Sequence, residues 1–298
     1  MPSIATLFKD KFEEFQKTNE EPLPRIFSIA PTICDVLSKH AIEYNPDTVW
    51  KVHHAFLVMD FAITLYNHIM RLSGNDNTVE IVALSGLLHD IGRLVEFDRT
   101  KGLINCDHGE VGAALVWEIM GTYSTQCTKK QFSFSLDDIE TLALLVQGHN
   151  RLDPHTFISK HISESDDLLR VLTYLLILQD ADRYINFTTL LTPPWFERVH
   201  AGGISPIDIT SHEASSAMIR RFKRAHYPLS RVFNSSLAQT LGDAVLCQLS
   251  WLGQFTYAYS YQLARSGDTV GYLTSLLAPG PNTMNIYSFL KKELDFFV

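Results

Sequence analysis

Six imidazole and carboxyl side chains stand at core-facing positions along the first two thirds of the chain. In chain order they are His54, His89, Asp90, His108, His149 and Asp182. Asp182 closes an apolar helical stripe, and an ionised carboxylate on a buried face is costly unless it is paired or bound to metal. Imidazole and carboxylate together are the ligands that Zn, Fe and Mn prefer. The ordered set therefore indicates a metal site.

The side chains in this set are carried by predicted helices, whose apolar residues recur in steps of three and four. Two such stripes, starting at Val49 and His54, run along one buried central helix. Asp47 is its expected N-cap, and Ser73-Gly74 its expected stop. The other helices of this region are predicted at about 78–89, 108–120, directly after Ser135, and at about 164–185.

Further helices are predicted on both sides of this region, and no convincing alternating strand pattern is present. Two precede it, at about 3–18 and 24–43, and the Gly- and Pro-containing segment 199–210 follows it as a loop. The last helices are expected at about 211–225, 235–265, 268–278 and 282–297. We therefore predict an all-α fold and treat residues 1–298 as a single domain.

Composition limits the classes of partner. The 298 residues have a net charge of -8 and no long basic run, which argues against duplex nucleic acid as a ligand. The most apolar stretch, 168–178, is only about half a membrane span and contains Arg170. Residues 1–12 contain no apolar signal segment. We expect a cytoplasmic protein that does not bind membranes.

Four sequence segments together resemble the HD superfamily of metal-dependent phosphohydrolases. They accompany His54 in the order GLLHDIGR (86–93), DHGEVGAALV (107–116), QGHN (147–150) and QDADRYI (179–185). The resemblance implies an HD-domain helical bundle over residues 45–190. It also implies N-terminal and C-terminal helical extensions, the latter over residues 205–298.

The same resemblance implies a dinuclear metal centre. One ion would be held by four residues, His54, His89, Asp90 and Asp182. The family pattern selects His54 over its neighbour His53, and Asp182, directly before a basic residue, over Asp180. Asp90 would bridge to a second ion, which His108 and His149 would hold. The expected cofactor is thus a pair of divalent transition-metal ions, Fe, Mn or Zn, with Mg as a further option.

Several neighbouring residues are candidates for substrate contact. Asp90 would fix the attacking hydroxide, and Arg93 and Arg183 would contact phosphate. An equally good interpretation makes the two arginines surface residues or partners of the nearby Asp98 and Asp180. Asn150, next to a predicted ligand, is a further candidate for substrate binding.

Asp180 has a second interpretation, because a carboxylate close to a metal site often orients a ligand histidine. The alternatives to a phosphohydrolase are a di-iron oxygenase of the HD type and a non-catalytic HD-fold ligand sensor. The expected reaction is hydrolysis of a phosphomonoester or phosphodiester, with a nucleotide or another small phosphorylated molecule as the substrate. The oligomeric state is open, and a homodimer is compatible with the sequence.

Overall fold

A computed structural model describes most of the 298-residue chain. The described residues are 3–18, 23–40, 42, 44–70, 79–99, 107–127, 133–192, 196, 208–224 and 238–278. Among them helices dominate, and the β-structure is limited to an isolated bridge between Asp208 and Thr240. The all-α prediction is confirmed. The chain divides into two compact units, 1–182 and 183–298. That residues 1–298 act as a single domain stays a prediction.

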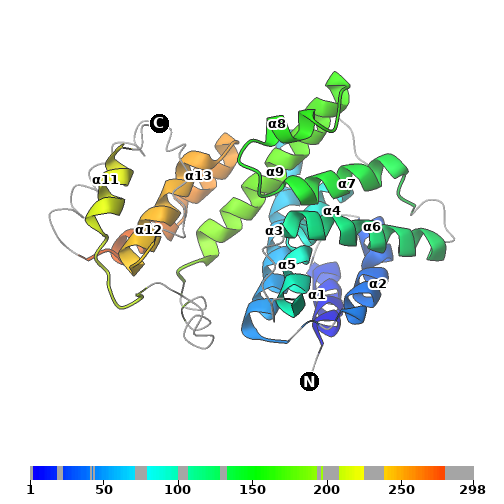
Figure 1. The fold of residues 1–298 in the computed structure, drawn as a ribbon, viewed down its shortest axis with the longest axis horizontal. Coiled ribbons are helices and arrows are strands. Elements are labelled where there is room, and N and C mark those ends of the chain that lie inside the picture. The colour runs from blue at the N-terminus through cyan, green and yellow to red at the C-terminus, as the bar shows by residue number, and fades with distance from the viewer. Residues whose placement is uncertain are drawn as a thin grey trace. The chain divides into compact units, whose positions relative to one another are not determined.

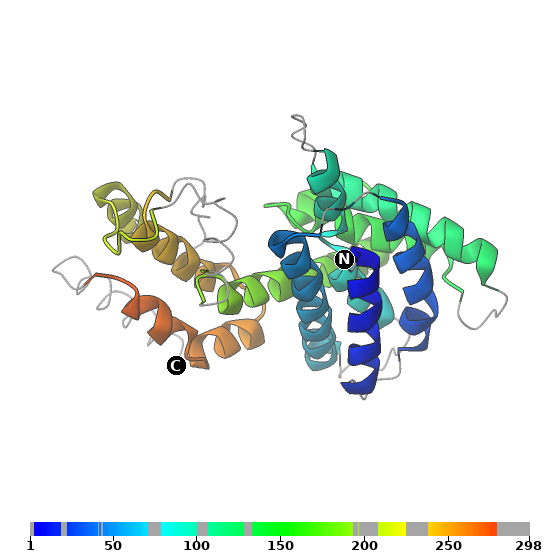
Figure 2. The ribbon, with the colours of Figure 1, turned by 90° about the horizontal axis from the view of Figure 1, so that it is seen from below.

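The first unit is a bundle around the central helix α3, with α1 and α4 packed against it (Figures 1 and 2). The helices α6 and α7 lie side by side and contact α5 and α4, respectively. The bounds of the helices in this region are α1 Ile4–Thr18, α2 Pro24–Lys39, α3 Pro46–Met70, α4 Val79–Leu88, α5 Ile91–Arg99, α6 His108–Gln126, α7 Leu136–Gly148, α8 Pro154–Ser159 and α9 Ser165–Thr189.

Helix α3 is apolar on two faces, as predicted, and both faces are buried. Its start differs from the prediction. Asn45, and not Asp47, accepts hydrogen bonds through its side chain from the backbone N–H groups of Asp47 and Thr48. The helix begins two residues earlier than expected because Pro46 occupies its first position, where a missing N–H costs nothing. The expected stop at Ser73-Gly74 lies outside the described residues.

Two glycines let the helices that carry the candidate ligands approach closely. A Cβ on Gly86 of α4 would lie 2.9 Å from the Met59 Cα of α3. A Cβ on Gly92 of α5 would lie 2.1 Å from the carbonyl oxygen of His108, at the start of α6. Both distances are shorter than real Cβ contacts, so any larger residue would push these helices apart.

Local sequence signals set several other helix ends. The prediction of a helix directly after Ser135 is confirmed, because Ser135 and Asp138 form a capping box at the start of α7. The helices α5 and α8 were not predicted. With nine and six residues, they are too short to display a repeated apolar stripe.

The second unit has a hydrophobic core of its own, which includes Val245 and Leu249 of α12 and Leu273 of α14. The single helix predicted over 235–265 is wrong. In its place, α12 is followed by a short 3₁₀ turn and, after a break at residues 255–257, by α13. The bounds are α11 Ser216–Arg224, α12 Leu241–Ser250, η4 Trp251–Gln254, α13 Ala258–Ser266 and α14 Thr269–Ser275.

Two sequence predictions for this part of the chain are left untested. The helix predicted at 282–297 lies outside the described residues, as does most of the predicted loop 199–210. Within the described part of the chain, no helix combines the length and the apolar character needed to cross a membrane.

Candidate metal centre

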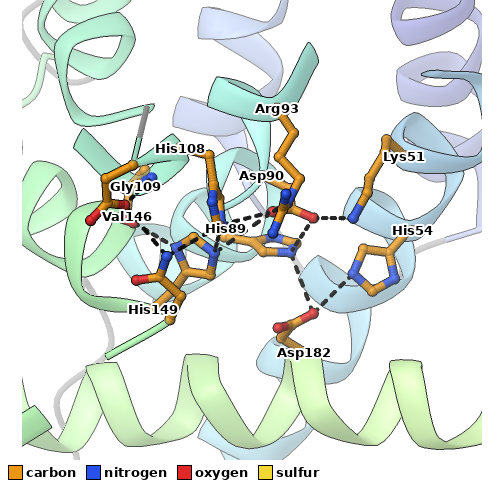
Figure 3. Close-up of polar contacts among 12 residues, drawn as sticks. Lys51, His54, His89, Asp90, Arg93, His108, Gly109, Val146, His149 and Asp182 are labelled. Carbon is orange, nitrogen blue, oxygen red and sulfur yellow. Dashed lines mark hydrogen bonds and ion pairs between the residues drawn. The ribbon is translucent and has the colours of Figure 1, made fainter. Parts of the chain in front are cut away.

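The six predicted ligand side chains converge in the first unit and form two adjacent groups of three (Figure 3). Within each group, the ligand atoms lie within 4.8 Å of one another. The first group is His54, His89 and Asp182, and the second is Asp90, His108 and His149. They come from α3, α6, α9 and the turns that follow α4 and α7.

The first group is centred on one oxygen of Asp182. Its Oδ1 lies 2.9 Å from Nε2 of His54 and 3.5 Å from Nε2 of His89. The two imidazole rings are almost completely buried, whereas the Asp182 side chain is 25% exposed. A ligand could therefore reach this group from the Asp182 side.

In the second group the two imidazole rings are inclined at 67° and direct their Nε2 atoms at each other. Nε2 of His108 lies 3.1 Å from Nε2 of His149, and Oδ1 of Asp90 lies 3.6 and 3.7 Å from these two atoms. The other carboxylate oxygen of Asp90, Oδ2, lies 3.6 Å from Nε2 of His89. Asp90 thus directs one oxygen at each group, as a carboxylate that bridges two cations does.

The ends of α4 and α7 orient two of the rings. Nδ1 of His89 donates to the carbonyl oxygen of Gly86, and Nδ1 of His149 donates to that of Val146, each over 2.7 Å. In both cases the acceptor lies three residues earlier, so the helix itself fixes the ring. With the proton on Nδ1, Nε2 of the neutral ring offers a lone pair, which is the state that a metal ion requires.

The donor set fits a pair of metal ions. Nε2 of His89 is fully buried and, among the described residues, has no hydrogen-bond partner. An ion about 2.1 Å from two ligands holds them roughly 3.0–3.4 Å apart at octahedral or tetrahedral angles. The separations of 2.9–3.7 Å between the ligand atoms of His54, His89, Asp90 and their partners bracket this range.

Electrostatics keep two of the imidazoles neutral. Burial lowers the pKa of His108 to about 4, and the nearby Arg93 and His149 reinforce the shift. Burial also lowers the pKa of His54, although its hydrogen bond to Asp182 opposes this effect. At neutral pH both rings are therefore available as metal ligands without competition from a proton.

The two carboxylates remain ionised because neighbouring charges and hydrogen bonds outweigh the effect of burial. Burial acts to raise the pKa of Asp90, but the charges of Lys51 and His89 outweigh it and hold this pKa well below its ordinary value. Burial likewise acts to raise the pKa of Asp182, and the hydrogen bond from His54 together with the charge of the nearby His89 overcomes it. The pKa of His89 is raised: burial opposes this, but the two carboxylates are the stronger influence.

Two cationic side chains contact Asp90 from different helices. Nζ of Lys51 lies 2.5 Å from Oδ2, and Nε of Arg93 lies 3.2 Å from Oδ1. Arg93 pairs with Asp90, and its predicted contact with phosphate stays a prediction. The side chain of Asp98, the alternative partner, lies outside the described part of the structure. Lys51 was missed, although it stands three residues before His54 and so on the same face of α3.

Polar residues at the second group tie its rings to the surrounding chain. Nδ2 of Asn150 lies 3.4 Å from Nε2 of His108 and the same distance from the Asp107 carboxylate. The buried Gln179 of α9 donates to the carbonyl oxygens of Gly148 and Arg151, on either side of His149. Gln179 was also missed, because a single polar residue on a helix has no signature of its own.

The remaining predicted site residues lie as follows. Of the paired candidates, His54 and Asp182 join the ligand groups, and His53 is a half-buried neighbour that contacts the ring of Trp50. Asp180 is fully buried, and its role in orienting a histidine stays a prediction. Arg183 donates to the carbonyl oxygen of Gln254 over 2.7 Å, and its contact with phosphate stays a prediction.

Comparison with known protein families agrees with the metal site that the geometry indicates. Residues 52–186 match the family model of the HD domain. The chain carries an HD domain. The match includes all six residues of the two ligand groups and lies within the predicted core of 45–190. Neither the comparison with curated proteins nor that with solved structures gave a match. HD domains are mostly metal-dependent phosphohydrolases.

Proposed function

We propose that the protein is a metal-dependent phosphohydrolase that acts on a nucleotide or another small phosphate ester. The observation that supports this most directly is the shared carboxylate. Asp90 directs its two oxygens at two adjacent ligand groups, and each group also contains two histidines. A structural ion pair would not need two groups of this kind around one carboxylate.

His54, His89, Asp182 and Asp90 would hold one ion, and His108 and His149 would hold a second with Asp90 between them. Divalent ions bound there would supply a water of lowered pKa and positive charge for the phosphoryl oxygens.

Side chains of the protein would bind and orient the substrate. Arg93 is 42% exposed and already directs its guanidinium at the centre, so it is the residue best placed to bind a phosphoryl oxygen. The exposed Asn150, beside His108, would bind another part of the substrate. In the reaction a water oxygen bonds to phosphorus while the bond from phosphorus to the ester oxygen breaks, and that oxygen leaves with a proton.

The test is a screen of nucleotides and small phosphate esters with added Mn, Fe, Mg or Zn. The wild-type protein is compared with His89→Ala and with His53→Ala, a matched control that removes the neighbouring half-buried histidine of the pair. We expect wild type and His53→Ala to release phosphate and His89→Ala to lose both activity and bound metal. Equal activity of wild type and His89→Ala would refute the proposal.

The same preparations distinguish the oxygenase hypothesis. Iron retained after aerobic purification, with oxygen consumption and no phosphate release, would favour an oxygenase over a hydrolase.

A further inference from the structure

Asp90 is the meeting point of two cations that the ligand set does not include. Lys51 reaches Oδ2 from α3, and Arg93 reaches Oδ1 from α5. Figure 3 shows Arg93 reaching Asp90 from above and Lys51 reaching it from the right, with Asp182 below in that view. The Asp90 side chain is only 8% exposed, whereas Lys51 is 25% and Arg93 is 42% exposed. The cations are thus closer to solvent than the carboxylate that they neutralise.

With its histidines neutral, as metal ligands must be, the charges of the described centre balance without any ion. The carboxylates of Asp90 and Asp182 carry two negative charges, and Lys51 and Arg93 carry two positive ones. Binding of two divalent ions would add four positive charges and would engage the Asp90 oxygens that Lys51 and Arg93 now contact. Because uncompensated charge in a mostly buried site is costly, the loaded centre requires an anion.

We propose that Lys51 and Arg93 release Asp90 when metal binds and together hold the dianionic phosphoryl group of a phosphomonoester. This inference rests on the proposed function and specifies its substrate class. A phosphomonoester carries close to two negative charges at neutral pH, whereas a phosphodiester carries one and would offset less of the surplus. Lys51 has a flexible four-carbon stem and is partly exposed, so its ammonium group can turn from Asp90 to a ligand.

The geometry favours a terminal phosphate over an internal one for a second reason. The two cations come from different helices and contact different oxygens of the same carboxylate. A group that replaces the carboxylate as their shared partner must also present separate charged oxygens to each of them. A terminal phosphoryl group has three such oxygens, and a diester has two that share a single charge.

The test measures binding and does not depend on turnover. Inorganic phosphate and dimethyl phosphate are titrated calorimetrically into the Mn-loaded wild type, Lys51→Met and Arg93→Met. The control is Lys39→Met, which removes a 53% exposed lysine that pairs only with Asp35 among the described residues. Metal stoichiometry is measured for each protein.

We expect wild type and Lys39→Met to bind phosphate at least about tenfold more tightly than dimethyl phosphate, in line with the strength of charge-assisted hydrogen bonds. Lys51→Met and Arg93→Met should each lose about tenfold in phosphate affinity at unchanged metal content. Their affinity for dimethyl phosphate should change less.

Four results would overturn the inference. The first is equal affinity of wild type for the two anions, and the second is phosphate binding by Lys51→Met that matches wild type. The third is loss of metal from Lys51→Met, which would make the lysine a part of the metal site. Metal-dependent hydrolysis of diesters in preference to monoesters would also refute it, while leaving the proposed function intact. Absence of any metal-dependent hydrolysis would count against the proposed function alone.

Discussion

Gly92 offers the sharpest test of how the fold holds the metal centre together. It follows Asp90 by two residues, and its Cα lies against the chain at His108, a ligand in the same group. In Gly92→Ala, the new Cβ would lie 2.1 Å from the His108 carbonyl oxygen and 2.8 Å from the backbone nitrogen of Gly112. Both of these atoms belong to the backbone of α6, so no side chain can turn away to make room.

The expected loss of stability in Gly92→Ala follows from the distance between the new Cβ and the His108 carbonyl oxygen. Real Cβ atoms essentially never approach another heavy atom within 3.0 Å, so α5 and α6 would have to separate by roughly 1 Å. Overpacking of this kind usually costs about 1–3 kcal/mol, and we expect a value near the upper end because the contact is between backbones. The same shift would move Asp90 away from His108 and weaken the second ligand group.

The assay is urea denaturation together with the metal content of the purified protein. Gly121→Ala is the matched control, because a Cβ at this exposed position of α6 meets nothing within 4 Å. That variant should be more stable than wild type by about 0.5–1 kcal/mol, since alanine favours a helix over glycine. Our account of the α5–α6 contact would be wrong if Gly92→Ala matched wild type in both stability and bound metal.

Three further predictions address individual side chains. Asp182→Ala should lose metal and also destabilise the fold, because the buried rings of His54 and His89 lose their carboxylate partner. Full metal stoichiometry in this variant, measured by mass spectrometry, would show that another carboxylate is the ligand. In the metal-free protein, the pKa of His108 is lowered to about 4 from the ordinary value of 6.5. The unfolded chain therefore binds more protons between these values, and lowering the pH from 6.5 towards 4 should cost stability. His108→Asn should lose less over the same window, and parallel pH profiles would contradict this. Gln179→Met should destabilise by about 1 kcal/mol, because the carbonyl oxygen of Arg151 loses its amide donor while that of Gly148 keeps the backbone N–H of Arg151. Thermal unfolding measures this effect, and an unchanged midpoint would mean that water replaces the amide.

The sequence was informative about the long helices and about the ligands. Apolar stripes predicted α3 and α9 because long buried helices repeat their pattern over several turns. The ligand residues were predictable because several of them stand at the start or end of such a stripe and carry a group that is costly to bury alone. His54 could be distinguished from His53, and Asp182 from Asp180, only through the resemblance to the HD superfamily.

Other features depend on contacts that local patterns do not encode. The break between α12 and α13 was missed because no proline marks it and apolar residues continue through it. Lys51 and Gln179 are ordinary polar residues of helices, and their partners lie 39 and up to 31 positions away in the chain. Only the packing of α3, α9 and the intervening helices brings such residues to the metal centre.

The course of α9 has a consequence for how this protein can be shortened or recombined. The helix runs without interruption from Ser165 to Thr189, yet the border between the two compact units falls after Asp182. The backbone carbonyl of a helical residue needs the N–H group four positions later. A chain cut at the border would leave Asp182 on a frayed final turn. Exchange of the second unit for another module would therefore preserve the metal centre only with a junction beyond residue 189. The border between the two compact units is thus a poor position at which to join two coding sequences.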